Sequence, residues 1–140
     1  MKKIILLLAV IAACGWANAQ PSVHATANEK AISNPNGPKA RFDKMINDFG
    51  EIDRGIPKTA EFTITNDGKE PLIIQKAQAS CGCTNLKYSQ EPILSGKSAV
   101  ISVTFNAASV GPFMKTITVT TNAEASPSVL QIKGTVVKKE

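Results

Sequence analysis

The sequence has few of the side chains on which common enzymes depend. Among its 140 residues there is one histidine, His24, and one tryptophan, Trp16, and aromatic residues make up 5% of the chain. Serine and cysteine hydrolases of the usual kind need a histidine base beside the nucleophile. His24 falls in a segment without apolar periodicity, and the chain contains neither a phosphate loop nor a dinucleotide-binding fingerprint. We therefore expect no catalytic residues and no enzyme.

Long apolar runs are also scarce, and the one that exists, Ile4–Ala13, lies near the N-terminus. It is too short to cross a bilayer, it follows Lys2-Lys3, and it precedes the small-x-small site Ala17-Asn18-Ala19. This order is typical of a secretory signal peptide over residues 1–19, cleaved before Gln20. The mature protein is then expected to be exported, to the periplasm or the extracellular space.

A second cleavage site competes with the first. Ile11-Ala12-Ala13-Cys14 resembles a bacterial lipobox, which would leave Cys14 lipidated and the protein tethered to a membrane as a lipoprotein. The apolar run is rather short for cleavage at this site, so we favour processing between Ala19 and Gln20. In either case the membrane contacts the protein only through the signal peptide or through lipidation of Cys14.

The charge of the chain gives no sign of a nucleic-acid partner. The formal net charge is +5, and removal of Lys2 and Lys3 with the signal peptide leaves 14 basic and 11 acidic residues, or +3. The remaining lysines are scattered, apart from Lys138-Lys139. Nucleic-acid binding needs a basic stripe with interleaved aromatic residues, so we interpret these lysines as a solvated surface.

Residues 20–40 follow the cleavage site and are rich in proline, with Pro35 and Pro38 inside the run Ser33-Asn34-Pro35-Asn36-Gly37-Pro38. This segment has no apolar periodicity and is therefore predicted to be a disordered linker. The folded domain is expected to occupy residues 41–138.

From Arg41 onward apolar and polar residues alternate, which is the period of a half-buried β-strand. Clear runs cover residues 59–65, 98–106, 113–121 and 130–136, and weaker ones lie within 41–52 and 71–79. Many of their residues are β-branched, as is usual in strands. The side chains predicted to be buried are Phe62, Ile64, Ile101, Val103, Phe105, Ile117, Val119, Leu130 and Ile132.

Turn residues separate these runs. Asn66-Asp67-Gly68-Lys69, Ser95-Gly96 and Gly111-Pro112 are predicted to be hairpin turns. The sequence shows no helix of useful length and no internal repeat. About seven short antiparallel strands at this spacing predict an immunoglobulin-like β-sandwich over residues 41–138, without the Cys…Trp…Cys pattern of true immunoglobulin domains.

The motifs of this domain also resemble a known family. They are Phe49-Gly50-x-Ile52, Glu61-Phe62-x-Ile64-x-Asn66-x-Gly68, Pro71-Leu72-x-Ile74, Ser80-Cys81-Gly82-Cys83-Thr84, Ile101-x-Val103-x-Phe105 and Leu130-x-Ile132-x-Gly134. Over Arg41–Val137 the chain is similar to the secreted bacterial domain-of-unknown-function family 1573. The resemblance implies a Hydin-like, immunoglobulin-like sandwich of the kind that acts mostly in protein binding or assembly, and it implies no reaction. Ser95 departs from the pattern, because the family more often has proline before the glycine of that turn.

The motif Ser80-Cys81-Gly82-Cys83-Thr84 is the main candidate for a functional site, and three interpretations of its cysteines stay open. Both could be reduced and buried as packing, although export favours disulfides. They could form a labile, redox-active disulfide. Residues two apart in an extended strand lie near the upper limit for a disulfide, which is about 6.8 Å between α-carbons. Gly82 would therefore have to let the chain fold tightly. They could instead hold a soft ion such as Cu(I), with Met45 or Met114 approaching in the fold.

The remaining candidate is a loose acidic group formed by Asp43, Asp48, Glu51 and Asp53. Solvation of strand ends and turns explains this group better than paired-carboxylate catalysis. We therefore expect the protein to bind a protein partner, or to support assembly, in the cell envelope and to need no cofactor. The alternative is a redox or Cu(I)-binding protein that uses the cysteine pair, which is predicted to lie at a strand end with its sulfurs close enough to bridge.

Overall fold

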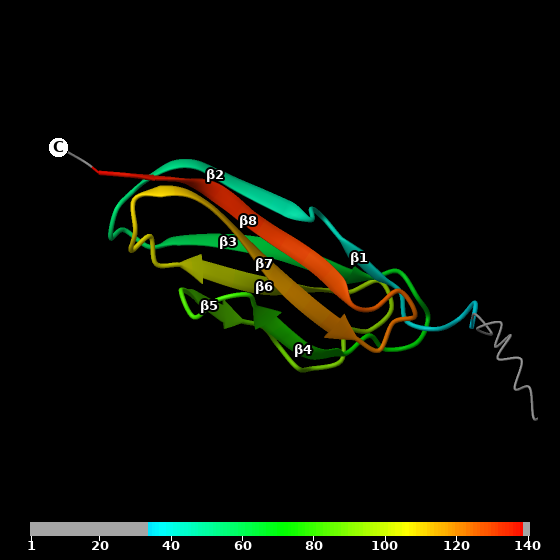
Figure 1. Cartoon of the computed structure of the whole chain (residues 1–140). Coiled ribbons are helices and arrows are strands. Elements are labelled where there is room, and N and C mark those ends of the chain that lie inside the picture. The colour runs from blue at the N-terminus through cyan, green and yellow to red at the C-terminus, as the bar shows by residue number, and fades with distance from the viewer. Residues whose placement is uncertain (1–33, 139–140) are drawn as a thin grey trace, which may run out of the picture. The chain divides into compact units, whose positions relative to one another are not determined.

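A computed structural model of the chain describes residues 34–138, so the predicted signal peptide, Cys14, His24 and the first part of the expected linker lie outside the described residues. The described part is built from β-strands (Figure 1). They are β1 (Ala40–Phe42), β2 (Ile46–Asp53), β3 (Lys58–Asn66), β4 (Ile74–Ala79), β5 (Thr84–Lys87), β6 (Ser98–Phe105), β7 (Gly111–Thr121) and β8 (Ser128–Val137). No helix in residues 34–138 is long and apolar enough to cross a membrane.

These strands form two four-stranded sheets, one ordered β1-β3-β6-β5 and the other β2-β8-β7-β4 (Figure 1). The two-layer arrangement confirms the predicted immunoglobulin-like β-sandwich. It differs from the expected seven or so antiparallel strands in two details, since there are eight strands and β2 pairs with β8 in parallel. The chain passes from one sheet to the other at residues 43–45, which separates β1 from β2 and explains both differences.

The core lies between the sheets and consists of the alternating apolar side chains. Each strand has one face against the opposite sheet, so every second residue is withdrawn from water. Burying a side chain of this size contributes about 1.5–3 kcal/mol, which makes this layer the main source of stability. All the side chains predicted to be buried are buried: Phe62, Ile64, Ile101, Val103, Phe105, Ile117, Val119, Leu130 and Ile132.

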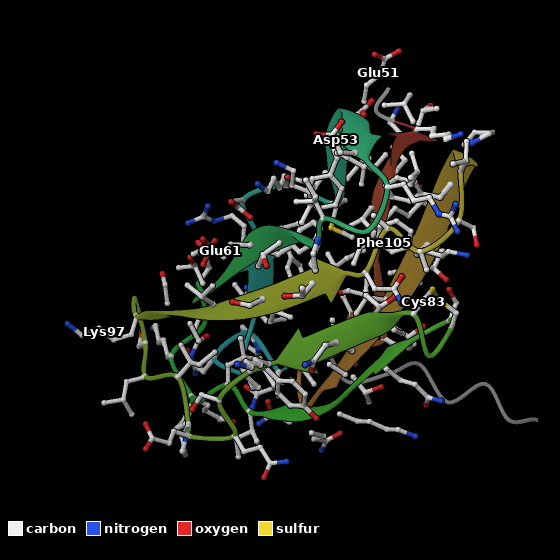
Figure 2. All side chains as sticks on the ribbon, turned by 90° about the vertical axis from the view of Figure 1, so that its left-hand side faces the viewer. Glu51, Asp53, Glu61, Cys83, Lys97 and Phe105 are labelled. Carbon is white, nitrogen blue, oxygen red and sulfur yellow. A yellow bond between two sulfur atoms is a disulfide. The ribbon has the colours of Figure 1, made fainter. Side chains whose placement is uncertain are left out.

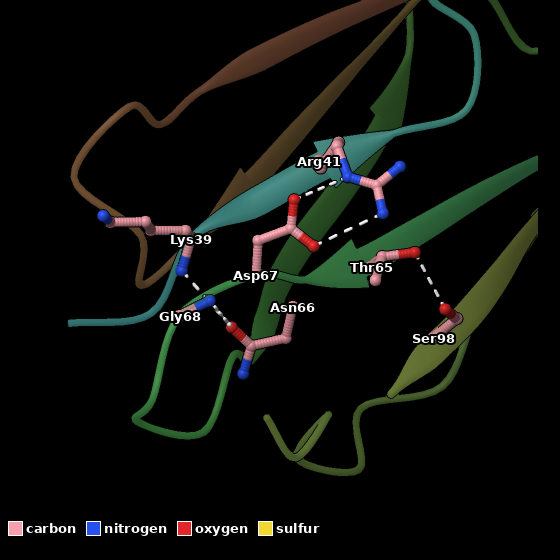
Figure 3. A network of polar contacts seen from close by, with 7 residues as sticks. All are labelled: Lys39, Arg41, Thr65, Asn66, Asp67, Gly68 and Ser98. Atoms are coloured by element: carbon pink, nitrogen blue, oxygen red, sulfur yellow. Dashed lines mark hydrogen bonds and ion pairs between the residues drawn. The ribbon is translucent and has the colours of Figure 1, made fainter. Parts of the chain in front are cut away.

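Asn66, the last residue of β3, organises the end of the sandwich next to β1. Its side chain is fully buried. The Oδ1 atom accepts hydrogen bonds from the backbone N–H groups of Gly68 at 2.9 Å and Lys39 at 3.3 Å (Figure 3). The Nδ2 atom donates to the carbonyls of Glu70 and Ile93, both at 2.8 Å. One asparagine thus satisfies four backbone groups from three chain segments, and a buried amide needs such partners to avoid a desolvation cost.

The segment before β1 lies against the same turn. The carbonyl of Asn36 accepts hydrogen bonds from the backbone N–H groups of Lys69 at 3.2 Å and Glu70 at 3.1 Å. Arg41 forms an ion pair with Asp67 across this turn (Figure 3). Residues 34–39, expected as the end of the linker, therefore make specific contacts with the domain.

Two of the three predicted hairpin turns do not connect neighbouring strands of one sheet. The Asn66–Lys69 turn leads from β3 in one sheet to β4 in the other, and Gly111-Pro112 lies within the start of β7. A sandwich needs connections that cross between its sheets, and turn residues alone do not distinguish these from hairpins. Ser95-Gly96 does form a turn before β6, where Gly96 has a φ of 73°.

Candidate binding groove beside the Cys81–Cys83 disulfide

Residues 80–83 are the point at which the chain crosses from β4 in one sheet to β5 in the other. The crossing is fixed at both ends by backbone hydrogen bonds. The N–H of Ser80 donates to the carbonyl of Thr116 on β7 at 2.9 Å, and the carbonyl of Cys83 accepts from the N–H of Asn106 after β6 at 3.2 Å. The cysteine motif is therefore held between the two sheets at the ends of two strands.

Within this crossing, Cys81 and Cys83 form a disulfide, with an S–S distance of 2.04 Å and a Cα–Cα distance of 5.4 Å. The Cα–Cα distance lies inside the usual range for a bridge. Gly82 does not provide this geometry through a left-handed backbone, because its φ lies outside that region, and a Cβ added to it would meet no atom within 4 Å. The chain does fold tightly at Gly82, as a bridge between residues two apart requires, but without a left-handed backbone at this glycine.

The two sulfurs have different surroundings. Thr84 Oγ1 lies 3.5 Å from Cys81 Sγ and 3.9 Å from Cys83 Sγ. Both cysteines are partly exposed, but Cys83 also packs against the core, close to Phe105 (Figure 2). The bridge is thus neither a fully buried packing element nor a free loop tip.

A groove of about 620 Å³ opens beside the disulfide. Its walls are residues 77–79 at the end of β4, the crossing itself and residues 84–86 of β5, with Pro57, Thr104 and Asn106 at its margins. None of the lining residues is charged, although 19% of the chain is charged. An uncharged hollow on a chain of this charge content is the kind of surface that binds a ligand or partner.

The same groove exposes the unpaired edges of both sheets. β4 pairs only with β7 and β5 only with β6, so each strand ends its sheet. In β5 the register Thr84↔Phe105, together with the bond from Asn106 N–H to the Cys83 carbonyl, leaves the backbone N–H and C=O of Thr84 and Leu86 facing away from β6. In β4 the hydrogen bond from the N–H of Ser80 to the carbonyl of Thr116 sets the same alternation. It leaves the backbone N–H and C=O of Ala77 and Ala79 facing away from β7. Such edges can pair with another extended chain.

A smaller hollow of about 180 Å³ lies on another side of Cys83. Cys83 lines it but Cys81 does not, and Phe105, Phe113 and Lys115 are among its other residues. The lysine is its one charged lining residue. The disulfide therefore lies between two hollows, and of its two cysteines only Cys83 lines both.

The other candidate residues lie away from this groove. Neither Met45 nor Met114 lines either hollow beside the cysteines; both are exposed, and Met114 lies beside Asp48 and Lys133 on the β2, β7 and β8 side. Among residues 34–138 no cluster of three or more histidine, cysteine or acidic side chains is arranged to hold a metal ion. In the disulfide form the cysteines also offer no thiolate to a soft ion.

The four acidic residues do not gather into one cluster: Asp48 and Glu51 line the same hollow, but no three of the four are arranged to hold a metal ion. Asp43 Oδ1 accepts hydrogen bonds from the backbone N–H groups of Lys44 at 2.8 Å and Thr63 at 2.9 Å. Asp48 accepts one from the N–H of Gly50 at 2.8 Å and pairs with Lys133 at 3.3 Å. The hydrogen bond from Gly50, followed by the interaction with Lys133, lowers the pKa of the Asp48 carboxyl. Asp43 and Asp48 thus fix turns and strand pairing.

Sequence reasoning missed the second wall of the groove. β5 spans Thr84–Lys87, and only Thr84 and Leu86 face inward, so its alternation is too short to stand out. The signal that was available is the alternation of Thr84 and Leu86 directly after the second cysteine. The first wall, β4, was expected, although it begins at Ile74 rather than at Pro71.

Fold and groove together define an immunoglobulin-like, PapD-like β-sandwich domain that carries a disulfide at a crossing between its sheets. Residues 40–136 match the family described as "Protein of unknown function (DUF1573)", and the chain belongs to this family. The resemblance inferred from the motifs is thereby confirmed. A comparison with curated proteins finds no match.

Solved structures show the same fold. A protein of unknown function from Porphyromonas gingivalis is similar with a TM-score of 0.64 and 16% identity, covering 77% of this chain and 51% of that chain, so this chain spans about half its length. The ASH / PapD-like domain 7 of human CEP192 gives a TM-score of 0.66 at 12% identity, covering 79% and 94%. The VesB protease of Vibrio cholerae gives 0.57 at 13%, covering 69% and 31%. Identities this low show a common fold and nothing about activity.

Proposed function

We propose that this protein is exported to the cell envelope and binds an extended segment of a partner protein in the groove between β4 and β5. The observation that carries the proposal is the meeting of two unpaired sheet edges in one uncharged groove. Backbone hydrogen bonding to a sheet edge gives affinity for an extended chain, and the side-chain pockets between the edges give specificity.

The lining of the groove fits such a ligand. Ala77 and Ala79 present small side chains, so a second backbone can come close to β4. Gln78 and Asn85 are exposed next to it and offer amide donors and acceptors for the backbone or polar side chains of a ligand. The absence of charge among the lining residues removes the desolvation cost that a charged wall would impose on an apolar or neutral segment.

Site-specific photo-crosslinking in the cells that produce the protein tests the binding site. A photoreactive side chain is introduced at Gln78 or Asn85, which line the groove, and at Val100 or Val129, which are exposed but lie outside it. Discrete protein adducts are expected at the two groove positions and not at the two controls. Adducts of equal yield at all four positions, or none at Gln78 and Asn85, would contradict the proposal.

A proline variant of the edge strand tests the binding mode. The N–H of Ala77 faces away from β7, so Ala77→Pro removes a donor on the open edge without removing a bond of the sheet. It is expected to abolish the adduct formed from Asn85 while the protein keeps a cooperative melting transition. An unchanged yield of adduct in a folded Ala77→Pro protein would show that the ligand does not pair with β4. Leu86→Pro then tests pairing with β5, because the N–H of Leu86 faces away from β6.

Export is tested separately through the N-terminus of the mature protein. Intact mass of protein isolated from its own host is expected to correspond to a chain that begins at Gln20. A diacylated or triacylated N-terminal Cys14 would show instead a membrane-anchored lipoprotein.

A further inference from the structure

We propose that the Cys81–Cys83 disulfide undergoes thiol–disulfide exchange with a cysteine of the extended segment that occupies the groove. This inference rests on the proposed binding function and adds the chemistry of the partner, which is a polypeptide with a cysteine thiol in an extended, largely uncharged stretch. Cys81, Gly82 and Cys83 all line the groove, so a bound segment passes directly over the bridge.

The bridge is poorly suited to a purely structural role. It closes a ring between residues only two apart, and so small a ring removes little conformational entropy from the unfolded chain. The crossing is already fixed by the backbone bonds of Ser80 and Cys83 to the two sheets. A partly exposed disulfide that adds little stability is accessible for exchange, because a thiolate can reach its sulfurs.

The geometry assigns different roles to the two sulfurs. A thiolate attacks one sulfur along the S–S axis, from the side opposite the other sulfur. The attacked sulfur must therefore be reachable from the side that faces away from its partner. Cys83 lines the smaller hollow and Cys81 does not, which makes Cys83 the accessible target. Lys115 in the lining of this hollow attracts the incoming thiolate.

Cys81 is then the leaving group. The hydroxyl of Thr84 lies 3.5 Å from Cys81 Sγ, nearer than to Cys83 Sγ, and can donate a hydrogen bond to the departing thiolate. A hydrogen bond to the charged form lowers the pKa of a thiol, and a leaving thiol of lower pKa departs faster. Thr84 is in this sense a positioning residue.

The exchange takes place in two steps, which together move two electrons from the partner thiols to the disulfide. The partner thiolate forms a bond to Cys83 Sγ, the Cys81–Cys83 bond breaks, and the electron pair stays on Cys81 as a thiolate. A second thiol of the partner, as its thiolate, then attacks the partner sulfur of the mixed disulfide and releases Cys83 as a thiolate. The partner dithiol is oxidised to a disulfide, Cys81 and Cys83 are reduced to the dithiol, and the two protons lost by the partner thiols are taken up by the two cysteines.

The first test uses the purified oxidised protein and a synthetic uncharged ten-residue peptide with one central cysteine, with glutathione as the comparison thiol. After acid quenching and alkylation, fragmentation mass spectrometry is expected to show the peptide on Cys83 and the alkyl group on Cys81, with the peptide reacting faster than glutathione. A peptide found mainly on Cys81, or no mixed disulfide with either thiol, would overturn the proposal.

The second test examines Thr84 in the reduced protein. The rate of Cys81 alkylation is measured against pH in wild type, in Thr84→Val and in the control Thr63→Val, whose side chain is on another strand outside the groove. Loss of a hydrogen bond to a charged group predicts a shift of the Thr84→Val profile to higher pH and an exchange rate lower by roughly tenfold. Identical profiles for all three proteins would remove Thr84 from the mechanism.

Binding and exchange can fail independently. When free thiols are alkylated before irradiation, the crosslinks from Gln78 and Asn85 are expected to persist while mixed disulfides disappear. Wild-type protein that crosslinks from the groove but never exchanges with the peptide thiol would refute the exchange and leave the binding function standing. Protein that gives no groove crosslinks would refute the binding function itself.

Discussion

Phe105 on β6 and Phe113 on β7 stack on each other, with ring centroids 4.1 Å apart and planes inclined by 21°. The two strands belong to different sheets, so this pair joins the layers of the sandwich. Both rings also line the smaller hollow beside Cys83. The stability of the core and the surroundings of the disulfide therefore depend on the same aromatic contact.

Phe105→Ala is expected to lower the free energy of unfolding by about 3–5 kcal/mol, the usual cost of truncating a buried aromatic side chain. Small domains have about 5–15 kcal/mol in total, so the variant should melt far below wild type or accumulate poorly. Val100→Ala on the same strand is the control, because Val100 faces solvent and its truncation should change stability by less than about 0.5 kcal/mol. Chemical denaturation of the three proteins measures both values, and an unchanged midpoint in Phe105→Ala would contradict the packing of β6.

Asn66→Ala is expected to cost more than about 2 kcal/mol, although it removes only a small polar side chain. The substitution leaves the buried N–H of Gly68 and the part-buried carbonyl of Glu70 without their Asn66 partner, and each such group costs about 1–3 kcal/mol. The carbonyl of Ile93 keeps its hydrogen bond from the N–H of Leu72. Asn85→Ala, at an exposed position, should fall within about 0.5 kcal/mol of wild type. Equal midpoints for the two variants would mean that water replaces the Asn66 side chain without cost.

Two glycine substitutions should have opposite outcomes. A Cβ on Gly134 would lie 2.7 Å from the carbonyl oxygen of Gly50 and 3.0 Å from Cζ of Phe113, so Gly134→Ala must push β8 away from β2. Overpacking of this kind costs about 1–3 kcal/mol. Gly82→Ala adds a Cβ into open space and should leave the melting temperature and the disulfide unchanged. Thermal melts with a thiol count check both, and a stable Gly134→Ala protein would show that the parallel β2–β8 pairing can relax.

Features of the fold that depend on neighbouring residues could be predicted from the sequence, and features that join distant residues could not. Alternation along a strand is local, so Phe62, Ile101 and Ile132 could be placed in the core from their own neighbours. The parallel pairing of Asp48 with Lys133 joins residues far apart in the chain, and nothing near either one indicates it. The groove requires the edges of two sheets to meet, so it became visible only once β4 and β5 had been placed. The cysteine motif was found by composition, but its position between two hollows could not be.

The Asp48–Lys133 contact predicts a dependence of stability on pH. The pKa of Asp48 is lowered in the folded protein, first by the hydrogen bond from Gly50 and then by Lys133. A carboxyl whose pKa is lowered on folding stabilises the protein above its unfolded pKa, and this contribution is lost as the pH falls through the folded value. The melting temperature of Asp48→Asn should therefore lie below that of wild type at pH 7. The difference should shrink once the pH drops below the ordinary aspartate pKa of 3.8, and it should vanish below the lower folded pKa. Lys133→Gln should show part of the same effect, and a difference that grows in acid would refute this account.

Replacing both cysteines, in Cys81→Ser/Cys83→Ser, is expected to lower the free energy of unfolding by less than about 2 kcal/mol, well below the cost of truncating a fully buried side chain. The reasons are that the ring is small, the cysteines are only partly buried, and the backbone bonds of Ser80 and Cys83 hold the crossing without the sulfurs. Denaturant unfolding of oxidised wild type, reduced wild type and the double variant separates two contributions. The step from oxidised to reduced protein reports the bridge, and the step from reduced protein to the double variant reports sulfur packing. A loss above about 3 kcal/mol in the second step would show that the pair serves chiefly as core packing, because that is the scale of a cavity left by a buried side chain.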